Sequence, residues 1–191
     1  MNMWFQWLLA VFVRSKRTPR LDLGAVSRIG FRVLPTDIDL LMHMNNGRYP
    51  SYMDLGRVDL TQRTGVEAKL AKHGIYAVVA AQTISYRKSL QLFQRFTIES
   101  RILGADERSF YVEQRFVVRG EVYARAIVRG RMIQKGAGTL KVADVERLTG
   151  LDLGGFELPA DVAHWGSTFK LPPTKADAPS VWDGEDAGIS R

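Results

Sequence analysis

The spacing of apolar and polar residues predicts a strand followed by a long helix in the first third of the chain. Residues 26–34 form an apolar run that ends at a proline, which is typical of a strand. Between residues 47 and 62, apolar and small residues recur at helical intervals. Pro50 is tolerated only in the first turn of a helix, so we expect the helix to begin just before it, with Asn45 or Asn46 as its N-cap.

Four extended segments follow the predicted helix and are separated by short turns. They occupy residues 76–86, 93–103, 109–119 and 121–133. Such closely spaced segments predict consecutive antiparallel strands. Apolar residues alternate with charged ones along them, which predicts a sheet with one apolar face and one face turned to solvent.

The predicted helix and sheet have surfaces that suit each other. Tyr49, Met53 and Gly56 form a stripe along the helix that is expected to pack on the apolar face of the sheet. At Gly56 the missing side chain permits close approach of the strands. We therefore expect a single α+β domain in which an antiparallel sheet wraps around one central helix.

The two ends of the chain differ in character from this central region. Residues 1–13 are apolar and aromatic and precede a basic run, but they are too few to span a bilayer and lack the order of a secretory signal. They are interpreted either as an interfacial helix on an anionic membrane or as a helix that covers an apolar patch of the same chain or of a partner subunit. We expect a short helix at residues 142–148 and irregular structure at residues 171–191. The expected organisation is a helix and linker at residues 1–20, a folded domain at residues 21–136 and an extension at residues 137–191.

Charge and residue content argue against several classes of function. Four of the seven net positive charges fall within the first twenty residues, so the body of the chain lacks the basic stripe of a nucleic-acid-binding protein. The absence of cysteine excludes a thiol nucleophile, and the three histidines are too far apart in sequence for a typical metal site. We expect no metal, no cofactor and no nucleic acid. A cytoplasmic location is expected, with residues 1–20 offering peripheral contact with the inner membrane.

The residues best suited to chemistry lie in the turn that precedes the helix. Asp37, Asp39 and His43 are followed by Asn45 and Asn46, at a helix start whose unpaired N–H groups favour developing negative charge. A carboxylate beside such groups can attack an acyl carbonyl or activate water while the amides stabilise the oxyanion. Alternatively, Asp39 only forms an Asx turn. Asp37 is expected to hold the turn, and His43 acts either as a base or as a support for the loop.

The same turn resembles a known family signature. The string TDIDLLMHMNNGRY, residues 36–49, resembles the pattern Asp-x-Asp-x-x-Gly-His-x-Asn-Asn-x-x-Tyr of 4-hydroxybenzoyl-CoA thioesterase-like hotdog proteins. The segments MDLGRVDL, ISYRKSLQLFQRF and FYVEQRFV are similar to the acyl-CoA thioesterase branch related to thioesterase superfamily member 6, so that the resemblance covers nearly residues 1–150. One departure is Met42, which stands where the family usually has glycine.

This resemblance implies a hotdog fold and hydrolysis of acyl-CoA thioesters to the free acid and CoA. It implies that Asp39 acts as nucleophile or general base, with His43 beside it and with amides at the helix start, near Asn46, as the oxyanion hole. It also implies a homodimer or homotetramer with active sites at subunit interfaces. The residues expected to contact the substrate are Asn45, Tyr49, Asp54, Arg87 and Lys88.

Several of these assignments have alternatives. Asp54 is a rival catalytic carboxylate on the central helix, although Arg57 offers it an ordinary ion pair. Arg87, Lys88 and Arg95 flank a turn between strands, where they either meet CoA phosphates or form a solvated hairpin end.

Two rival functions are considered. In enoyl-CoA hydratase-type hotdog proteins the usual Asp-to-His separation is five positions, whereas His43 lies four positions after Asp39 and six after Asp37. A non-catalytic acyl-CoA or lipid-binding module at a membrane surface is the second rival, suggested by the apolar amino-terminal segment.

Overall fold

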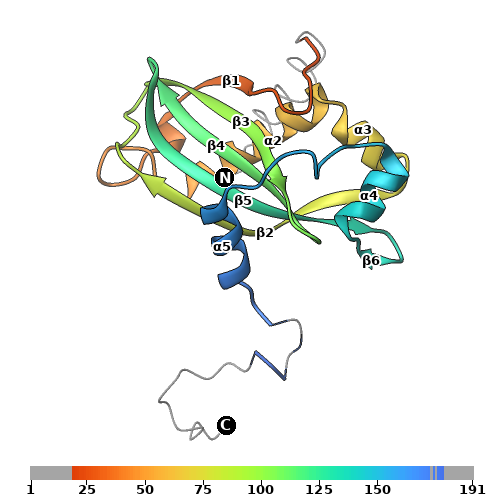
Figure 1. Ribbon diagram of the computed structural model, residues 1–191. Coiled ribbons are helices and arrows are strands. Elements are labelled where there is room, and N and C mark those ends of the chain that lie inside the picture. Colours follow the sequence, from red (N-terminus) through yellow and green to blue (C-terminus); the bar gives the residue numbers. More distant parts are fainter. Residues whose placement is uncertain (1–18, 173, 175, 179–191) are drawn as a thin grey trace, which may run out of the picture.

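The computed structural model describes residues 19–172, 174 and 176–178, and within them one curled antiparallel sheet wraps around a central helix (Figure 1). The strand order is β1-β3-β4-β5-β2, with β6 paired to β5. The strands are β1 (Ser27–Arg32), β2 (Ile75–Tyr86), β3 (Arg95–Ala105), β4 (Phe110–Val118), β5 (Glu121–Gln134) and β6 (Gly138–Thr139). The α+β hotdog architecture is thereby confirmed. The predicted amino-terminal helix and most of the predicted irregular tail lie outside the described residues.

The central helix α2 (Arg48–Arg63) packs its apolar stripe on the concave face of the sheet, as predicted. Tyr49 and Met53 are buried in the main core. A Cβ at Gly56 would stand 2.8 Å from the side chain of Ile98 and 2.9 Å from Ser100 Oγ, so only glycine permits this approach. Pro50 occupies the third helical position, where its missing N–H costs nothing.

The predicted N-cap was wrong by one or two residues. Gly47 is the N-cap of α2, and the side chain of Asn45 caps the preceding turn instead, because its Oδ1 accepts a hydrogen bond of 2.8 Å from Gly47 N–H. An asparagine can bond its own backbone two residues on, and here that local bond competes with capping the helix.

Three further helices flank the sheet (Figure 1). The predicted short helix is α4 (Val142–Thr149), which packs with α3 (Val66–Ala71) in a second apolar cluster. The third, α5 (Ala160–Thr168), lies on the face of the sheet opposite α2, where Val162 joins Leu103 and Tyr111 in a third cluster. Neither α3 nor α5 was predicted. Since both α4 and α5 contribute to the packed core, part of the region after residue 136 belongs to the folded body.

The face predicted to be turned to solvent is only partly exposed. Glu113 of β4, one of the charged residues that alternate with apolar ones, lies on this face but is only 1% exposed. Arg101, Arg115 and Arg125 surround its carboxylate, and the helix α5 covers the neighbouring part of the same face. Three ion pairs allow a carboxylate to be buried on a face that alternation alone assigns to water.

Candidate functional site

The turn between β1 and α2 is anchored by Asp37, which ends a single 3-10 turn (Pro35–Asp37) and is fully buried. Its Oδ2 accepts hydrogen bonds from Leu34 N–H, at 2.9 Å, and from the hydroxyl of Tyr52, at 2.6 Å. Its Oδ1 accepts from Nε and Nη2 of Arg48, at 2.8 and 2.7 Å. With both oxygens occupied, Asp37 fixes the turn to the first two turns of α2 and has no oxygen left for a substrate.

Asp39 begins a tight loop whose backbone closes on itself. Its N–H donates to the carbonyl of His43 at 3.1 Å, and its carbonyl accepts from Met42 N–H at 3.0 Å. Met42 takes the left-handed conformation, with φ of 62°, which explains why glycine suits this position in related sequences. The loop tip carries Leu40 and Leu41, which are both exposed.

The two carboxylate oxygens of Asp39 differ in their contacts. Oδ1 accepts a 2.9 Å hydrogen bond from Leu41 N–H, so the Asx turn considered from the sequence is present. Oδ2 has only a 3.5 Å contact with the side-chain amide of Asn45. The side chain is 24% exposed, in contrast to the fully buried Asp37. Asp39 therefore offers one loosely held oxygen on a partly exposed side chain.

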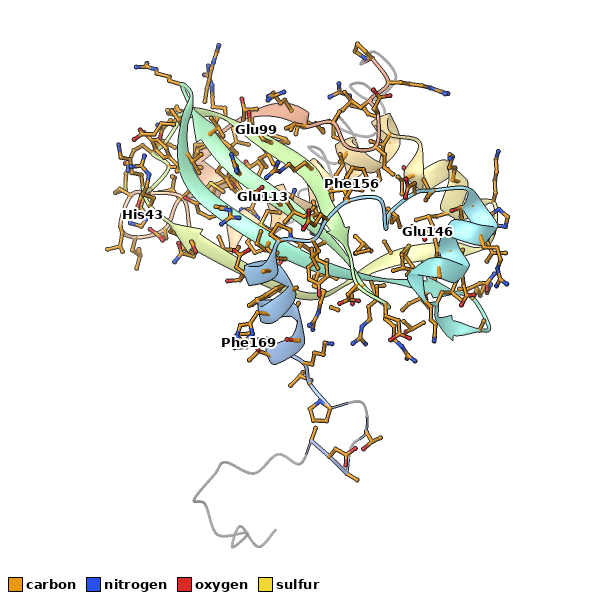
Figure 2. The ribbon with its side chains drawn as sticks, viewed as in Figure 1. His43, Glu99, Glu113, Glu146, Phe156 and Phe169 are labelled. Carbon is orange, nitrogen blue, oxygen red and sulfur yellow. The ribbon has the colours of Figure 1, made fainter. Side chains whose placement is uncertain are left out.

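His43 stands beside this carboxylate, at the end of the sheet away from α4 (Figure 2). Its Nδ1 is 3.7 Å from Asp39 Oδ1, which is too long for a hydrogen bond, and this buried nitrogen has no hydrogen-bond partner among the described residues. The strand-like segment behind it is held by Met44 N–H, which donates to the carbonyl of Leu90 at 2.8 Å, and by a bridge between His43 and Gln91.

The turn that leads into α2 leaves a backbone donor at Asn46, the residue after Asn45, whose side chain contacts Asp39. Arg48 N–H bonds the carbonyl of Asn45 at 2.9 Å, and Tyr49 N–H makes a long bond of 3.3 Å to the carbonyl of Asn46. In the described part of the chain, the N–H of Asn46 has no backbone acceptor. An exposed donor of this kind at a helix start is suited to a developing oxyanion.

The predicted substrate contacts fall into two groups. Asn45 lies in the turn, and Tyr49 lies immediately behind it in the core, where burial raises its pKa more than a hydrogen bond from the backbone of Leu90 lowers it. The ring of Tyr49 meets that of Tyr86 edge-on, with centroids 4.9 Å apart. Tyr86 ends the edge strand β2 and is 44% exposed, so the site borders the open edge of the sheet.

The second group consists of the charged residues, and each of them forms an ion pair with another side chain. Asp54 is paired with Arg57, as the sequence suggested. Arg87 and Lys88 both pair with the carboxylate of Glu121, which occupies much of their charge. The structure thus brings Asp39, His43, Asn45 and Asn46 together in the turn before α2. The ion pairs of Asp54, Arg87 and Lys88 lie outside this turn.

Sequence reasoning missed the residues that hold the turn in place. Arg48 and Tyr52 were not singled out, although they stand one turn apart on the helix that follows Asp37. The segment at Leu90 and Gln91 gave no signal, because its contact with the turn depends on a pairing distant in sequence. Among the described residues, no group of three or more potential metal ligands is found, and no helix is long and apolar enough to cross a membrane.

Comparison with known proteins gives consistent matches. A family profile described as the thioesterase-like superfamily matches residues 33–166. Protein THEM6 of Xenopus laevis is 38% identical over 133 residues, which cover 70% of this chain and 63% of that protein. A probable thioesterase of Saccharomyces cerevisiae is 29% identical over 119 residues, covering 61% of this chain and 52% of its own length. The chain therefore matches less than two thirds of the length of these relatives.

The solved structures add support for the fold. The crystal structure of the probable thioesterase YbaW from Escherichia coli superposes with a TM-score of 0.60 at 22% identity, covering 63% of this chain and 93% of that protein. At this level of identity the likeness concerns the arrangement of helix and strands.

Proposed function

The chain belongs to the thioesterase-like superfamily, and from this premise we propose that it hydrolyses acyl-CoA thioesters to the free acid and CoA. The observation that carries the proposal is that a loosely held Asp39 Oδ2 shares a turn with the N–H of Asn46, which precedes α2 and has no backbone acceptor among the described residues. A nucleophile or base and an oxyanion donor are the two parts that acyl transfer needs.

In the proposed mechanism, Oδ2 of Asp39 is the reacting oxygen because Oδ1 is held by Leu41 N–H. It either attacks the thioester carbon and expels the CoA thiolate, giving an anhydride that water cleaves, or removes a proton from the attacking water. The amide of Asn46 donates to the carbonyl oxygen as it becomes negative, an effect on the order of 3 kcal/mol for one donor. The ring of His43 lies beside the carboxylate, and its backbone carbonyl accepts the hydrogen bond from Asp39 N–H that closes the loop.

We further propose that a second copy of the chain completes the site. The ring of Tyr86, on the open edge strand β2, touches Tyr49 at the helix start. A second copy paired along that edge would wall the space in front of Asp39 and shelter the acyl group from water. This arrangement supports the homodimer or homotetramer expected from the sequence.

Substitution Asp39→Asn tests the assignment of the catalytic carboxylate. It keeps the size and the Asx-type acceptor of the side chain but removes its charge, so kcat should fall by roughly a hundredfold or more. Thiol release from a panel of acyl-CoA thioesters measures the effect, and circular dichroism checks that the variant is folded.

Two matched variants separate the alternatives. Asp54→Asn removes the rival carboxylate on α2, and Asp144→Asn removes an exposed acid on α4. Both should retain activity within a few-fold of the unchanged protein. If Asp54→Asn abolishes turnover and Asp39→Asn does not, the mechanism proposed here is wrong.

A non-catalytic acyl-CoA or lipid-binding module is the second candidate. The exposed side chains of Leu40, Leu41 and Met42 at the loop tip favour it, because an apolar tip suits contact with a lipid surface or an acyl chain. Tight binding of acyl-CoA without any release of thiol would select this function. Vesicle binding that requires residues 1–20 would support the proposed peripheral membrane contact.

A further inference from the structure

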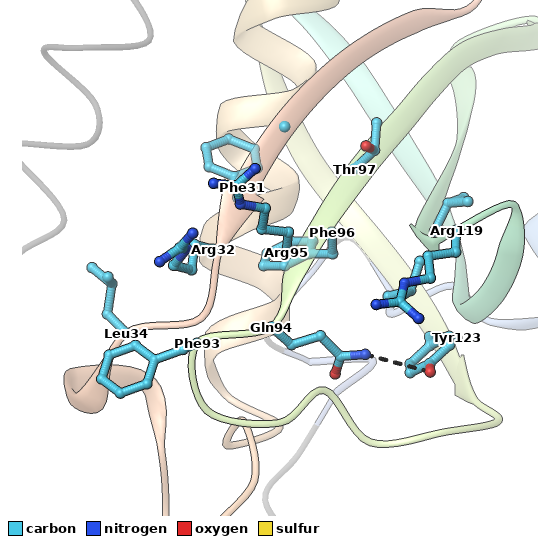
Figure 3. A pocket seen from close by; sticks show the side chains of 13 residues that line it. Phe31, Arg32, Leu34, Phe93, Gln94, Arg95, Phe96, Thr97, Arg119 and Tyr123 are labelled. Carbon is cyan, nitrogen blue, oxygen red and sulfur yellow. Dashed lines mark hydrogen bonds between the residues drawn. The ribbon is translucent and has the colours of Figure 1, made fainter.

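A groove with a volume of about 1180 Å³ opens beside the turn, where β1 ends, β3 begins and β4 turns into β5 (Figure 3). Its lining combines apolar side chains, among them Phe93 and Val117, with three arginines: Arg32, Arg95 and Arg119. No acidic residue of the described part of the chain lines it. The groove therefore has apolar walls and a strongly positive rim.

The arginines are arranged at a cost to the fold. Arg32 of β1 and Arg95 of β3 stand directly opposite each other in the antiparallel register. Like charges in this position repel each other and destabilise the pair. Among the described residues, no carboxylate lies within ion-pair distance of Arg32, Arg95 or Arg119, whereas eleven other arginines and lysines have such partners. An anion bound between them would offset the repulsion.

Backbone strain is concentrated at the same groove. Of the three non-glycine residues with positive φ in the described part of the chain, two line it: Phe93, with φ of 60°, and Arg119, with φ of 48°. The left-handed conformation costs roughly 1 to 2 kcal/mol for residues with a side chain. Phe93 is 55% exposed, so the strain at this residue does not serve to bury its ring. Figure 3 shows Arg32 and Arg95 on one side of the groove and Arg119 on the other, beside Tyr123.

The groove is joined to the site turn through a short common wall. Phe93 N–H donates to the carbonyl of Val33 at 3.0 Å, and Gln94 N–H donates to the carbonyl of Gln91, also at 3.0 Å. Gln91 in turn forms the bridge with His43. The segment at residues 91–94 therefore links the wall of the groove to the turn that carries Asp39 and His43.

We propose that this groove binds the phosphorylated nucleotide end of a CoA thioester, with Arg32, Arg95 and Arg119 contacting its phosphates and the exposed ring of Phe93 beside its base. The proposal rests on the proposed function and adds the residues that recognise the carrier. Arginine forks match phosphate geometry, and base-on-aromatic stacking suits an exposed ring. The hairpin end at Arg87 and Lys88 is less suited, because both side chains already pair with Glu121, which offsets one of their two charges.

Calorimetric titration with CoA, without any acyl group, tests the groove directly. Arg32→Gln, Arg95→Gln and Arg119→Gln should each weaken CoA binding by about tenfold, the loss of one charge-assisted contact. Lys88→Gln tests the hairpin end, and Arg108→Gln is the matched control on an exposed turn outside the groove. Arg95→Gln should not lower the thermal stability, since it relieves the opposed charges, so weak binding is not a consequence of unfolding. CoA affinity that is unchanged in all three groove variants would overturn the proposal.

Turnover separates this proposal from the proposed function. The groove variants should lose kcat/KM for acyl-CoA through a higher KM, and should retain kcat/KM for the same acyl group on N-acetylcysteamine, which has no phosphate. If no thioester is hydrolysed at all, the proposed function fails, while CoA titration still tests whether the groove binds CoA.

The last experiment measures binding of the protein to vesicles of phosphatidylserine and phosphatidylcholine. Loss of vesicle binding with unchanged CoA binding would assign the arginines to a lipid surface and overturn the CoA site.

Discussion

Glu113 is a buried carboxylate on a face of the sheet whose neighbouring residues are partly exposed to water. Arg125 Nε donates to Oε1 of Glu113 at 2.7 Å, and Arg101 Nε donates to Oε2 at 2.9 Å. Arg115 adds a further bond of 2.9 Å to Oε1. Burial alone would raise the pKa of Glu113, but the hydrogen bonds from Arg125, Arg101 and Arg115 outweigh it and lower the pKa to about 2.

This lowered pKa predicts an acid-dependent loss of stability. The charged form of Glu113 stabilises the folded state above its unfolded pKa, near 4.5, and the contribution is lost as the pH falls from there towards 2. Glu113→Gln should cost about 2 kcal/mol at pH 7, and the difference from the unchanged protein should shrink between pH 4.5 and pH 2.5. Urea unfolding at several pH values measures this difference in stability.

The control is Glu99→Gln, at an exposed pair with Arg28, which should cost less than about 1 kcal/mol. Parallel pH curves for the Glu113 variant and the unchanged protein would contradict the expectation.

At the scale of single residues, the sequence indicated which face of the sheet a residue lies on. It did not indicate which side chains that residue contacts. The turn with Asp39, His43 and Asn46 was recognisable because its residues are neighbours in the chain. The opposition of Arg32 and Arg95 was not, because it depends on the register of two strands that lie more than sixty residues apart. Alternation assigned Glu113 to a face, and only the folded structure shows its three partners.

At the scale of elements, α5 is attached to the sheet by apolar contacts and by Arg129 of β5. Its Nη1 donates to the carbonyl of Gly166 and its Nη2 to that of Phe169 at 2.9 Å, at the end of the helix where carbonyls lack partners. The guanidinium also lies 5.9 Å from the ring of Trp165. Gly166 permits the contact, since a Cβ there would stand 2.0 Å from the hydroxyl of Tyr111.

Loss of this anchor should release α5 before the rest of the fold. Arg129→Met keeps an apolar stem but leaves the helix carbonyls unpaired, at a cost of about 2 kcal/mol. Amide hydrogen exchange should accelerate across Ala160–Thr168 and remain slow in β3 and β4. Arg131→Met, two residues along the same strand, is the control, because Arg131 has no ion pair among the described residues. Uniform acceleration throughout the sheet would show that the arginine supports the whole core instead.

The predictability of each element follows from the length of its pattern. The helix α2 was predicted because sixteen residues carry a sustained helical period, and the strands β2 to β5 because their extended pattern persists over nine or more residues. The helix α5 has only nine residues, although Pro159 at its N-cap and Asp161 in its first turn were available signals. Its burial depends on Arg129 and Tyr111, which are more than thirty residues away in the chain and invisible to a local pattern.

At the scale of the whole molecule, the edge strand β2 is the feature that calls for a partner. Among the described strands it pairs only with β5, and its exposed side chains include Tyr76, Val79 and Tyr86. A long edge with exposed apolar residues and unpaired backbone groups favours pairing with another strand. Since Tyr86 also touches the helix start, the edge and the candidate site form one continuous surface. We therefore expect a two-fold pair of chains that meet along β2.

Placing a charge on this edge should separate the pair. Val79→Lys brings two like charges together near a two-fold contact, and we expect mostly single chains at micromolar concentration, with activity per chain falling in parallel because each site loses its second wall. Light scattering after size-exclusion chromatography measures the mass. Leu171→Lys, at a residue exposed outside the sheet, is the matched control and should leave the mass unchanged. A protein that is already monomeric and fully active, or a Val79→Lys variant that remains paired, would mean that the space in front of Asp39 is closed by the chain's own residues.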